Sequence, residues 1–460
     1  MSAKEQELLM KKELGYDSFD SDLTKNVMDF AELYKDFMVN TFTERTFVAK
    51  SVQLLEENGY KKYERGMSLN SGDKIYFPNR GRALIAVEIG TESLGSGVNL
   101  VGSHVDSPKL DLKPVPLMEA DGCMLIKTHY YGGIKKYNWT AIPLALIGTV
   151  ALKTGETVDV SIGLDEQDTV FTISDLLPHL ASKQMQKKMS EGITGEQLNA
   201  VGATIPFDDE DAKEKIKLNF IYLLNEKYNI TEADLISADL CLVPAFKLKD
   251  VGLDRSLLGG YGQDDRVCAY TSLKALLDSK PSDKTKVVLF SDREEVGSMG
   301  NTGMESKFLE NTLEELADCF GVKLRDILTN TVCLSSDVCA AYDPNYAEVF
   351  EKNNTPFLNG GVAFMKYTGA RGKSGSSEAS AELVSKIRAM LDDNDVKWQI
   401  GELGKVDEGG GGTIAQMVAN LGADVIDCGV PLWSMHSPFE ISSKYDVYMA
   451  YKAYKVFFGA

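Results

Sequence analysis

The sequence predicts an α/β protein in which a mixed sheet is flanked by helices and interrupted by an inserted β-rich segment. Apolar runs such as 98–102 and 286–290 are typical of strands buried in a parallel sheet. After residues 114–116 the pattern changes to short alternating strands, and strand–helix alternation returns after Gly259. We therefore predict one discontinuous domain, residues 1–114 and 245–460, that encloses an inserted domain, residues 115–244.

The elements before and within the insertion follow from periodicity. Residues 27–57 are predicted to be helical because apolar side chains recur there at helical spacing. Residues 82–89 and 98–102 are predicted strands. Within the insertion, 158–162 alternates apolar and polar residues like a half-exposed strand, whereas the polar stretch 182–215 predicts a mobile excursion.

The elements after the insertion alternate between helix and strand. Val267, Tyr270 and Leu277 mark a helix on one apolar face. The following predicted elements are strands at 286–290, 331–334 and 423–426, a helix at 379–391, and a closing helix from about Lys444.

Composition limits the classes of function. A net charge of −19 over 460 residues disfavours binding to nucleic acid or to an anionic membrane. The sequence has no apolar run long enough for a membrane-spanning helix and no signal-peptide pattern at its start. Seven scattered cysteines without a Cys-x-x-Cys pair predict reduced thiols, a cytoplasmic location and no thiolate zinc site.

Ligand-type side chains gather where predicted strands end. Because ligands in open α/β sheets bind at the carboxyl ends of strands, these positions form one candidate site. Adjacent carboxylates are tolerated there if one binds a cation and the other exchanges a proton, although two solvated loop acids are the simpler alternative. The candidates are His104 and Asp106, Asp264 and Asp265, Glu294 and Glu295, Asp337, and His436.

The composition of this set predicts a metal centre. Two imidazoles with several carboxylates suit zinc first, with cobalt or manganese as alternatives. A carboxylate that bridges two ions is the arrangement of dinuclear hydrolases. Only four histidines occur in the chain, and two of them fall at predicted strand ends, so structural roles for both are the weaker hypothesis.

Several motifs carry a resemblance to a known family. They lie at 102–114, 264–268, 293–298, 336–337, 344–346 and 431–436. In this order they resemble the M18 metallo-aminopeptidases, the aspartyl aminopeptidase group, in a bacterial-type branch. The resemblance implies a zinc exopeptidase-like catalytic domain with an inserted dimerisation domain. It also implies an aminopeptidase with two divalent ions per subunit that acts on short peptides, with acidic N-terminal residues as candidates.

The resemblance also implies roles for individual residues. The implied ligands are Asp264 as the bridge, His104 and Asp337 at one ion, and Glu295 and His436 at the other. Glu294 would be the general base, and Asp106 would orient His104. Asp265 is expected to support a loop or a helix N-terminus. Family histidines after the Asp337-type ligand are replaced here by Ala340 and Asp343.

Substrate contacts are assigned to four positions. His179 matches a family position on the insertion that reaches a neighbouring subunit's active site, although a surface or core role is equally open. Lys366 could hold an acidic substrate side chain, or it could be a solvated lysine. Asp407 is a candidate for the substrate ammonium. Gly410, in the glycine run 409–412 that is expected to open a helix, could line the pocket.

The oligomeric state is also predicted from the resemblance. Family resemblance implies a homo-oligomer, a tetrahedral dodecamer built from dimers. Two other functions remain open at this point. One is a carboxypeptidase, deacylase or glucanase-like hydrolase on the same scaffold, and the other is a non-catalytic scaffold protein. Every implied ligand and Glu294 are present, which disfavours the second.

Overall fold

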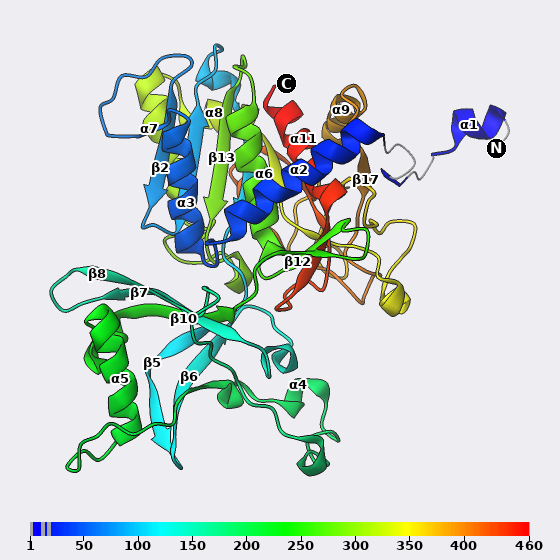
Figure 1. Cartoon of the computed structure of the whole chain (residues 1–460). Helices are drawn as coiled ribbons and strands as arrows, with labels where there is room; N and C mark the ends of the chain where they lie inside the picture. Colours follow the sequence, from blue (N-terminus) through cyan, green and yellow to red (C-terminus); the bar gives the residue numbers. More distant parts are fainter. Residues whose placement is uncertain (1–2, 11–13, 16–19, 460) are drawn as a thin grey trace.

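The computed structural model describes residues 3–10, 14–15 and 20–459 and contains three sheets (Figure 1). The nine-stranded sheet and its helices form the upper part of Figure 1, and a six-stranded sheet lies below them. A five-stranded sheet completes the fold. Within the described residues, no helix is both long and apolar enough to cross a membrane.

The nine-stranded sheet is parallel at its centre and mixed at its edges. In spatial order its strands are β1 (Lys61–Lys62), β2 (Lys74–Asn79), β3 (Ala83–Glu88), β13 (Thr285–Ser291), β4 (Val98–His104), β14 (Val332–Ser336), β18 (Asp424–Gly429), β16 (Val362–Met365) and β17 (Trp398–Ile400). The strands from β13 to β18 run parallel, with Ser291 opposite His104. The carboxyl ends of three neighbouring strands, β13, β4 and β14, therefore meet at one edge of the sheet.

Two helical layers cover this sheet, and alternate side chains of β13 face each layer. Val288 and Phe290 belong to one core and Val287 and Leu289 to the other, as the period-two geometry of a strand requires. The first layer contains α2 (Ser21–Met38), α3 (Glu44–Glu57), α6 (Gln263–Asp278), α9 (Ala381–Asp392) and α11 (Lys444–Phe458). The second contains α7 (Phe308–Phe320), α8 (Leu324–Asn330) and α10 (Ala415–Asn420). Helix α1 (Ala3–Leu8) lies near the N-terminus.

The helical region predicted at 27–57 is in fact two helices. The chain leaves α2 at Val39 and starts α3 at Thr43, whose hydroxyl accepts from the backbone N–H of Thr46. Such an N-cap satisfies a helix-terminal donor and begins a new helix, a signal that apolar periodicity does not contain. The other predicted helices and main-sheet strands are confirmed to within a few residues.

The six-stranded sheet is antiparallel throughout and has its own apolar core. Its strands, in spatial order, are β8 (Thr157–Ile162), β7 (Leu144–Ala151), β10 (Ala238–Pro244), β5 (Lys109–Ala120), β6 (Cys123–Tyr131) and β9 (Asn199–Ala203). Helix α5 (Lys215–Tyr228) packs on it around Trp139 and Leu146. The stretch 182–215 has more regular structure than predicted, because it contains α4 (Met189–Gly192) and β9, which pairs with β6.

The five-stranded sheet was not predicted, because its strands are short. It consists of β11 (Lys249–Val251), β12 (Leu257–Gly260), β20 (Glu440–Ser443), β19 (Pro431–Trp433) and β15 (Cys339–Ala340). Short 3-10 turns lie at Leu94–Ser96, Lys136–Trp139, Pro178–Leu180, Gly195–Gln197, Glu232–Ser237, Glu294–Val296 and Pro344–Val349. The turn at Glu294–Val296 follows β13 and bears the paired glutamates.

Candidate active site

The predicted metal-ligating side chains converge at the edge where β13, β4 and β14 end. His104 is the last residue of β4, Glu295 lies in the turn after β13, and Asp337 follows β14. Asp264 and His436 arrive differently. Asp264 opens α6 and His436 lies in the turn between β19 and β20, so both follow strands of the five-stranded sheet. The prediction that both residues follow strands holds, but the sequence did not predict that these strands form a separate sheet.

Asp264 lies between the two imidazoles. Its Oδ1 is 3.2 Å from Nε2 of His104, and its Oδ2 is 3.2 Å from Nε2 of His436. The side chain is nearly fully buried, with 4% of its surface exposed. Each carboxylate oxygen thus faces one imidazole nitrogen, which is the placement that a bridging carboxylate requires.

The other carboxylates divide between the two histidines. Oδ1 of Asp337 lies 3.7 Å from Nε2 of His104, and Oε2 of Glu295 lies 3.4 Å from Nε2 of His436. Oε2 of Glu294 lies 3.9 Å from Nε2 of His104. The structure therefore brings the five predicted ligands and the predicted base together.

The buried oxygens fit a cation site. Oε1 of Glu295 is buried and has no hydrogen-bond partner among the described residues. Ligand atoms of His104, Asp264 and Glu295 lie within 4.8 Å of one another, as do those of His104, Asp265 and Asp337. A set of imidazole nitrogens and carboxylate oxygens without sulfur matches the ligands that zinc takes in catalytic sites.

Asp265 differs from its prediction. The N-terminus of α6 has no side-chain cap, and within the described chain neither carboxylate oxygen of Asp265 has a hydrogen-bond partner. Burial, reinforced by the charge of Asp337, raises its pKa well above the usual value. Its side chain thus lies beside the metal-ligand cluster and does not cap the helix.

Asp106 organises one side of the cluster. Its Oδ1 accepts the backbone N–H of Glu294 at 3.1 Å and lies 3.3 Å from Nδ1 of His104. Its Oδ2 accepts the backbone N–H of Glu295 at 3.2 Å and the hydroxyl of Tyr131 at 2.8 Å. This arrangement favours a proton on Nδ1 of His104 and leaves Nε2 for a metal.

Two supporting groups were missed by the sequence analysis. Glu440 accepts the backbone N–H of His436 at 2.8 Å and that of Asp264 at 3.1 Å, so it mirrors Asp106 on the other side. The carbonyl of Gly133 lies 2.8 Å from Nδ1 of His436. A single glutamate at the start of a short strand has no distinguishing pattern. The contact of Gly133 is made by its backbone carbonyl, which no residue type marks in a sequence.

The electrostatics of the cluster favour bound positive charge. Burial raises the pKa of Glu294 to about 8, with the charges of Asp337, Asp106 and Asp264 adding to the effect. Burial disfavours the charged form of His436, but its hydrogen bond to Asp264 prevails and raises its pKa to about 10. Burial would raise the pKa of Asp264 as well, yet His104 and His436 hold it below the usual value. Excess carboxylates in a buried site attract cations.

The predicted substrate-binding residues lie on other segments. Among the described residues, none of these four forms a hydrogen bond or ion pair with the metal-ligand cluster. His179 is exposed in the turn Pro178–Leu180, and Asp407 is exposed in a loop. Lys366 follows β16, and its Nζ lies 3.8 Å from Glu378. Gly410 has φ +124°, and its backbone packs so closely on Gly369 that a side chain would clash. The helix expected after this glycine run is confirmed as α10.

Fold and site together define a metal-dependent hydrolase, with an α/β sheet that presents imidazoles and carboxylates at its strand ends. The family model "Aminopeptidase I zinc metalloprotease (M18)" matches residues 37–458, so the chain belongs to the M18 family of aminopeptidases. The predicted family, fold class and enzyme class are therefore confirmed. The carboxypeptidase, deacylase and scaffold alternatives are not favoured.

Relatives and solved structures agree with this assignment. The "Probable M18 family aminopeptidase 1" of Clostridium acetobutylicum is 48% identical, over 98% of this chain and 99% of the relative. That of Thermotoga maritima is 46% identical, over 93% and 94%. The crystal structure of the T. maritima M18 enzyme has a TM-score of 0.94 at 44% identity, over 98% and 99% of the two chains. The S. cerevisiae mApe1 dodecamer shares the fold, with a TM-score of 0.76 at 24% identity, over 94% and 96%.

Proposed function

We propose that this enzyme is a dinuclear aminopeptidase whose two ions share Asp264. One observation carries the proposal, which is that the two oxygens of Asp264 each lie 3.2 Å from a different histidine Nε2. His104 and Asp337 would complete one ion's ligands, and Glu295 and His436 those of the other. Zinc fits this ligand set first, with cobalt and manganese as alternatives. Bound divalent ions would polarise the scissile carbonyl and lower the pKa of a bound water.

Glu294 is the proposed general base. Its backbone N–H is fixed by Asp106, and its carboxylate lies in the cluster beside His104. A pKa raised to about 8 suits a group that must accept and release a proton near neutral pH. Glu294 accepts the proton of the attacking water and delivers it to the amine nitrogen of the leaving peptide. Asp106 keeps the imidazole and both glutamate backbones in place.

The proposed substrates are short peptides with a free N-terminus, acidic residues among them. In this proposal Asp407 binds the substrate ammonium, Lys366 binds an acidic side chain, and the bare backbone at Gly410 lines the pocket. The support for Lys366 is its half-exposed cationic side chain, which reaches Glu378 only at 3.8 Å. The support for Gly410 is a close backbone packing that admits no side chain.

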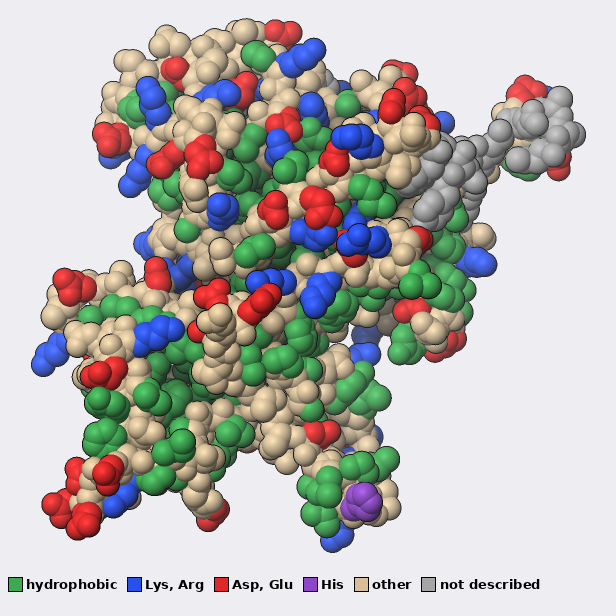
Figure 2. Space-filling view, in the orientation of Figure 1, with side chains coloured by type: hydrophobic (Ala, Val, Ile, Leu, Met, Phe, Trp, Pro, Cys, Tyr) green, Lys and Arg blue, Asp and Glu red, His purple; other side chains and the backbone are tan. Residues whose placement is uncertain are grey.

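The insertion, residues 115–244, is the proposed oligomerisation domain. It exposes large apolar side chains, which monomeric proteins rarely gather on one face, and Figure 2 shows apolar surface over this lower part of the molecule. They include Leu176, Leu177, Leu180, Met185 and Met189. His179 lies among them and would reach a neighbouring subunit. We extend the dodecamer of the S. cerevisiae enzyme to this chain, in tetrahedral form. Seven free cysteines are consistent with a cytoplasmic location.

Replacing the base tests this function. Glu294→Gln removes the proton acceptor but keeps the side-chain volume, so metal content and fold should persist while kcat falls by about 10²–10⁴-fold or more. Turnover of aminoacyl anilides, elemental analysis and circular dichroism measure the three quantities. The exposed Glu305→Gln is the matched control and should behave like the wild type. Wild-type kcat in Glu294→Gln would refute the assigned role.

A further inference from the structure

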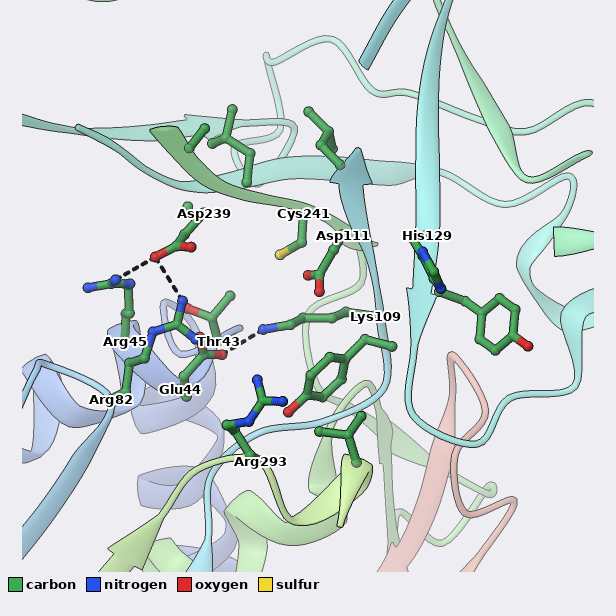
Figure 3. Close-up of a pocket in the computed structure, with 17 residues that line it drawn as sticks. Thr43, Glu44, Arg45, Arg82, Lys109, Asp111, His129, Asp239, Cys241 and Arg293 are labelled. Carbon is green, nitrogen blue, oxygen red and sulfur yellow. Dashed lines mark hydrogen bonds and ion pairs between the residues drawn. The ribbon is translucent and has the colours of Figure 1, made fainter. Parts of the chain in front are cut away.

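A cavity lies beside the active site, where the six-stranded sheet meets α3 and the loop after β13. It has a volume of about 450 Å³, a size typical of small-ligand pockets. Figure 3 shows its walls, which come from residues 43–45, from β5 and β10, and from Arg293. None of the described metal-ligand residues lines it.

Most charged side chains in this cavity neutralise one another. Glu44 pairs with Lys109 at 2.7 Å and with Arg82 at 3.1 Å. Asp239 pairs with Arg82 at 2.8 Å and with Arg45 at 2.5 Å. These contacts join α3 and the strand β3 region to the six-stranded sheet. Because Oδ2 of Asp292 also lies 3.7 Å from Arg82, three carboxylates balance the three cations. The contacts hold the cavity walls together and leave little net charge for a ligand.

Two opposite charges remain after these pairs are counted. Asp111, on β5, and Arg293, before the paired glutamates, both line the cavity. Neither has an oppositely charged side chain within ion-pair distance in the described part of the chain. The Nε of Arg293 donates to the carbonyl of Met299 at 2.8 Å, and in Figure 3 its guanidinium extends into the cavity. Burial raises the pKa of Asp111, against the opposing charge of Lys109.

We propose that this cavity is a binding site for a free α-amino acid, with its carboxylate at Arg293 and its ammonium at Asp111. A cavity that offers one unpaired cation and one unpaired anion matches a zwitterion, because each of these half-buried charges then gains a partner. The choice of an amino acid among zwitterions rests on the proposed function, since an aminopeptidase releases amino acids. The cavity would thus hold a product molecule outside the active site.

A ligand bound in the cavity would affect the loop that bears Glu294 and Glu295, because its partner Arg293 belongs to the same stretch of backbone. Arg293 is bonded directly to Glu294, and the next two N–H groups are held by Asp106. Tyr131 lines the cavity and donates to the same Asp106 carboxylate. We therefore expect a released amino acid to inhibit the enzyme in two ways. It competes with substrate at the active site, and it inhibits noncompetitively when it binds the cavity.

Calorimetric titration of the zinc-loaded holoenzyme with glycine tests the site. The wild type should bind two glycines per subunit, one of them in the cavity. Asp111→Asn and Arg293→Gln should each weaken the cavity event about tenfold or abolish it, because each removes one charge-assisted contact. Asp208→Asn, an exposed change on the same insertion, is the control and should bind like the wild type.

Truncated ligands sharpen the result. Acetate lacks the ammonium and glycinamide lacks the carboxylate, so neither should occupy the cavity as glycine does. The proposal is overturned if Asp111→Asn retains both glycines with wild-type affinity, or if acetate binds the cavity as tightly as glycine. The titration measures binding without turnover. If glycine does not bind the cavity, the proposed role of Glu294 is unaffected. If Glu294→Gln is fully active, the titration still shows whether the cavity binds glycine.

Discussion

The nine-stranded and six-stranded sheets contribute different kinds of groups to the active site. The nine-stranded sheet supplies charged side chains from its strand ends, among them the proposed metal ligands His104, Glu295 and Asp337. The six-stranded sheet supplies the hydroxyl of Tyr131, at the end of β6, and the turn that follows β6 supplies the carbonyl of Gly133. Both groups are neutral. Asp264 and His436 follow strands of the five-stranded sheet, so the charged groups come from two sheets and the six-stranded sheet adds neutral hydrogen-bonding groups.

This division has a physical basis. Strands that are buried on both faces hold their ends rigidly, which suits ligands that must sit within a few tenths of an ångström. Neutral groups add no charge to a cluster already crowded with carboxylates, yet they fix a ring or a carboxylate in place. The orientation of the ligands therefore depends on how the second sheet sits against the first.

The largest expected effect comes from the residue that faces both histidines. Asp264→Ala should lose both ions, whereas His436→Ala should lose one, because Asp264 contacts both imidazoles and His436 is the proposed ligand of one ion only. Activity should fall roughly a thousandfold or more in both variants. Elemental analysis after gel filtration counts the ions. The exposed Asp393→Ala provides the control, and two ions retained in Asp264→Ala would contradict a shared ligand.

A smaller effect is expected from the six-stranded sheet. Tyr131→Phe removes one hydroxyl from Asp106 and should lower metal affinity or kcat about 10–100-fold, as outer-shell changes commonly do. Chelator competition and anilide kinetics measure the two quantities. Tyr130→Phe, the neighbour on β6, removes a more exposed hydroxyl and should have no effect. Equal behaviour of the two variants would show that the second sheet does not orient the site.

The smallest expected effect concerns the contact between the sheets. Arg82 pairs with Glu44 and Asp239, so Arg82→Met should lower the free energy of unfolding by about 2 kcal/mol. Arg45 shares Asp239 but is more exposed, and Arg45→Met should cost at most about 1 kcal/mol. Urea denaturation measures the free energy of unfolding of both variants. A reversed order would mean that Arg82 does not link the two parts.

The sequence predicted the site residues whose chemical type alone marks them as possible metal ligands or bases. His104, Glu294, Glu295 and Asp337 were found because ligand-type residues follow buried apolar runs, a local signal. Their meeting point followed from the parallel pairing of those strands. The geometry confirms that the predicted residues lie together, while their individual roles stay predictions.

What the sequence did not predict depends on long-range packing. Glu440 lies in a four-residue strand of a sheet formed by segments nearly 200 residues apart, and no local pattern reports that pairing. The helix break at 39–43 was missed because the side-chain cap of Thr43 interrupts a continuous apolar periodicity. The cavity with Asp111 and Arg293 arises only where two sheets meet.

The path of the chain between the sheets ties them together covalently. Strand β4 ends at His104 and β5 starts at Lys109, so the short segment 105–108 carries Asp106 from one sheet to the other. The insertion is therefore not an exchangeable cassette. Cutting it out at 115 and 244 would delete Tyr131 and Gly133 and strip β5 of its hairpin partner. Changes in the six-stranded sheet that move the start of β5 would therefore also move Asp106, whose carboxylate lies 3.3 Å from Nδ1 of His104.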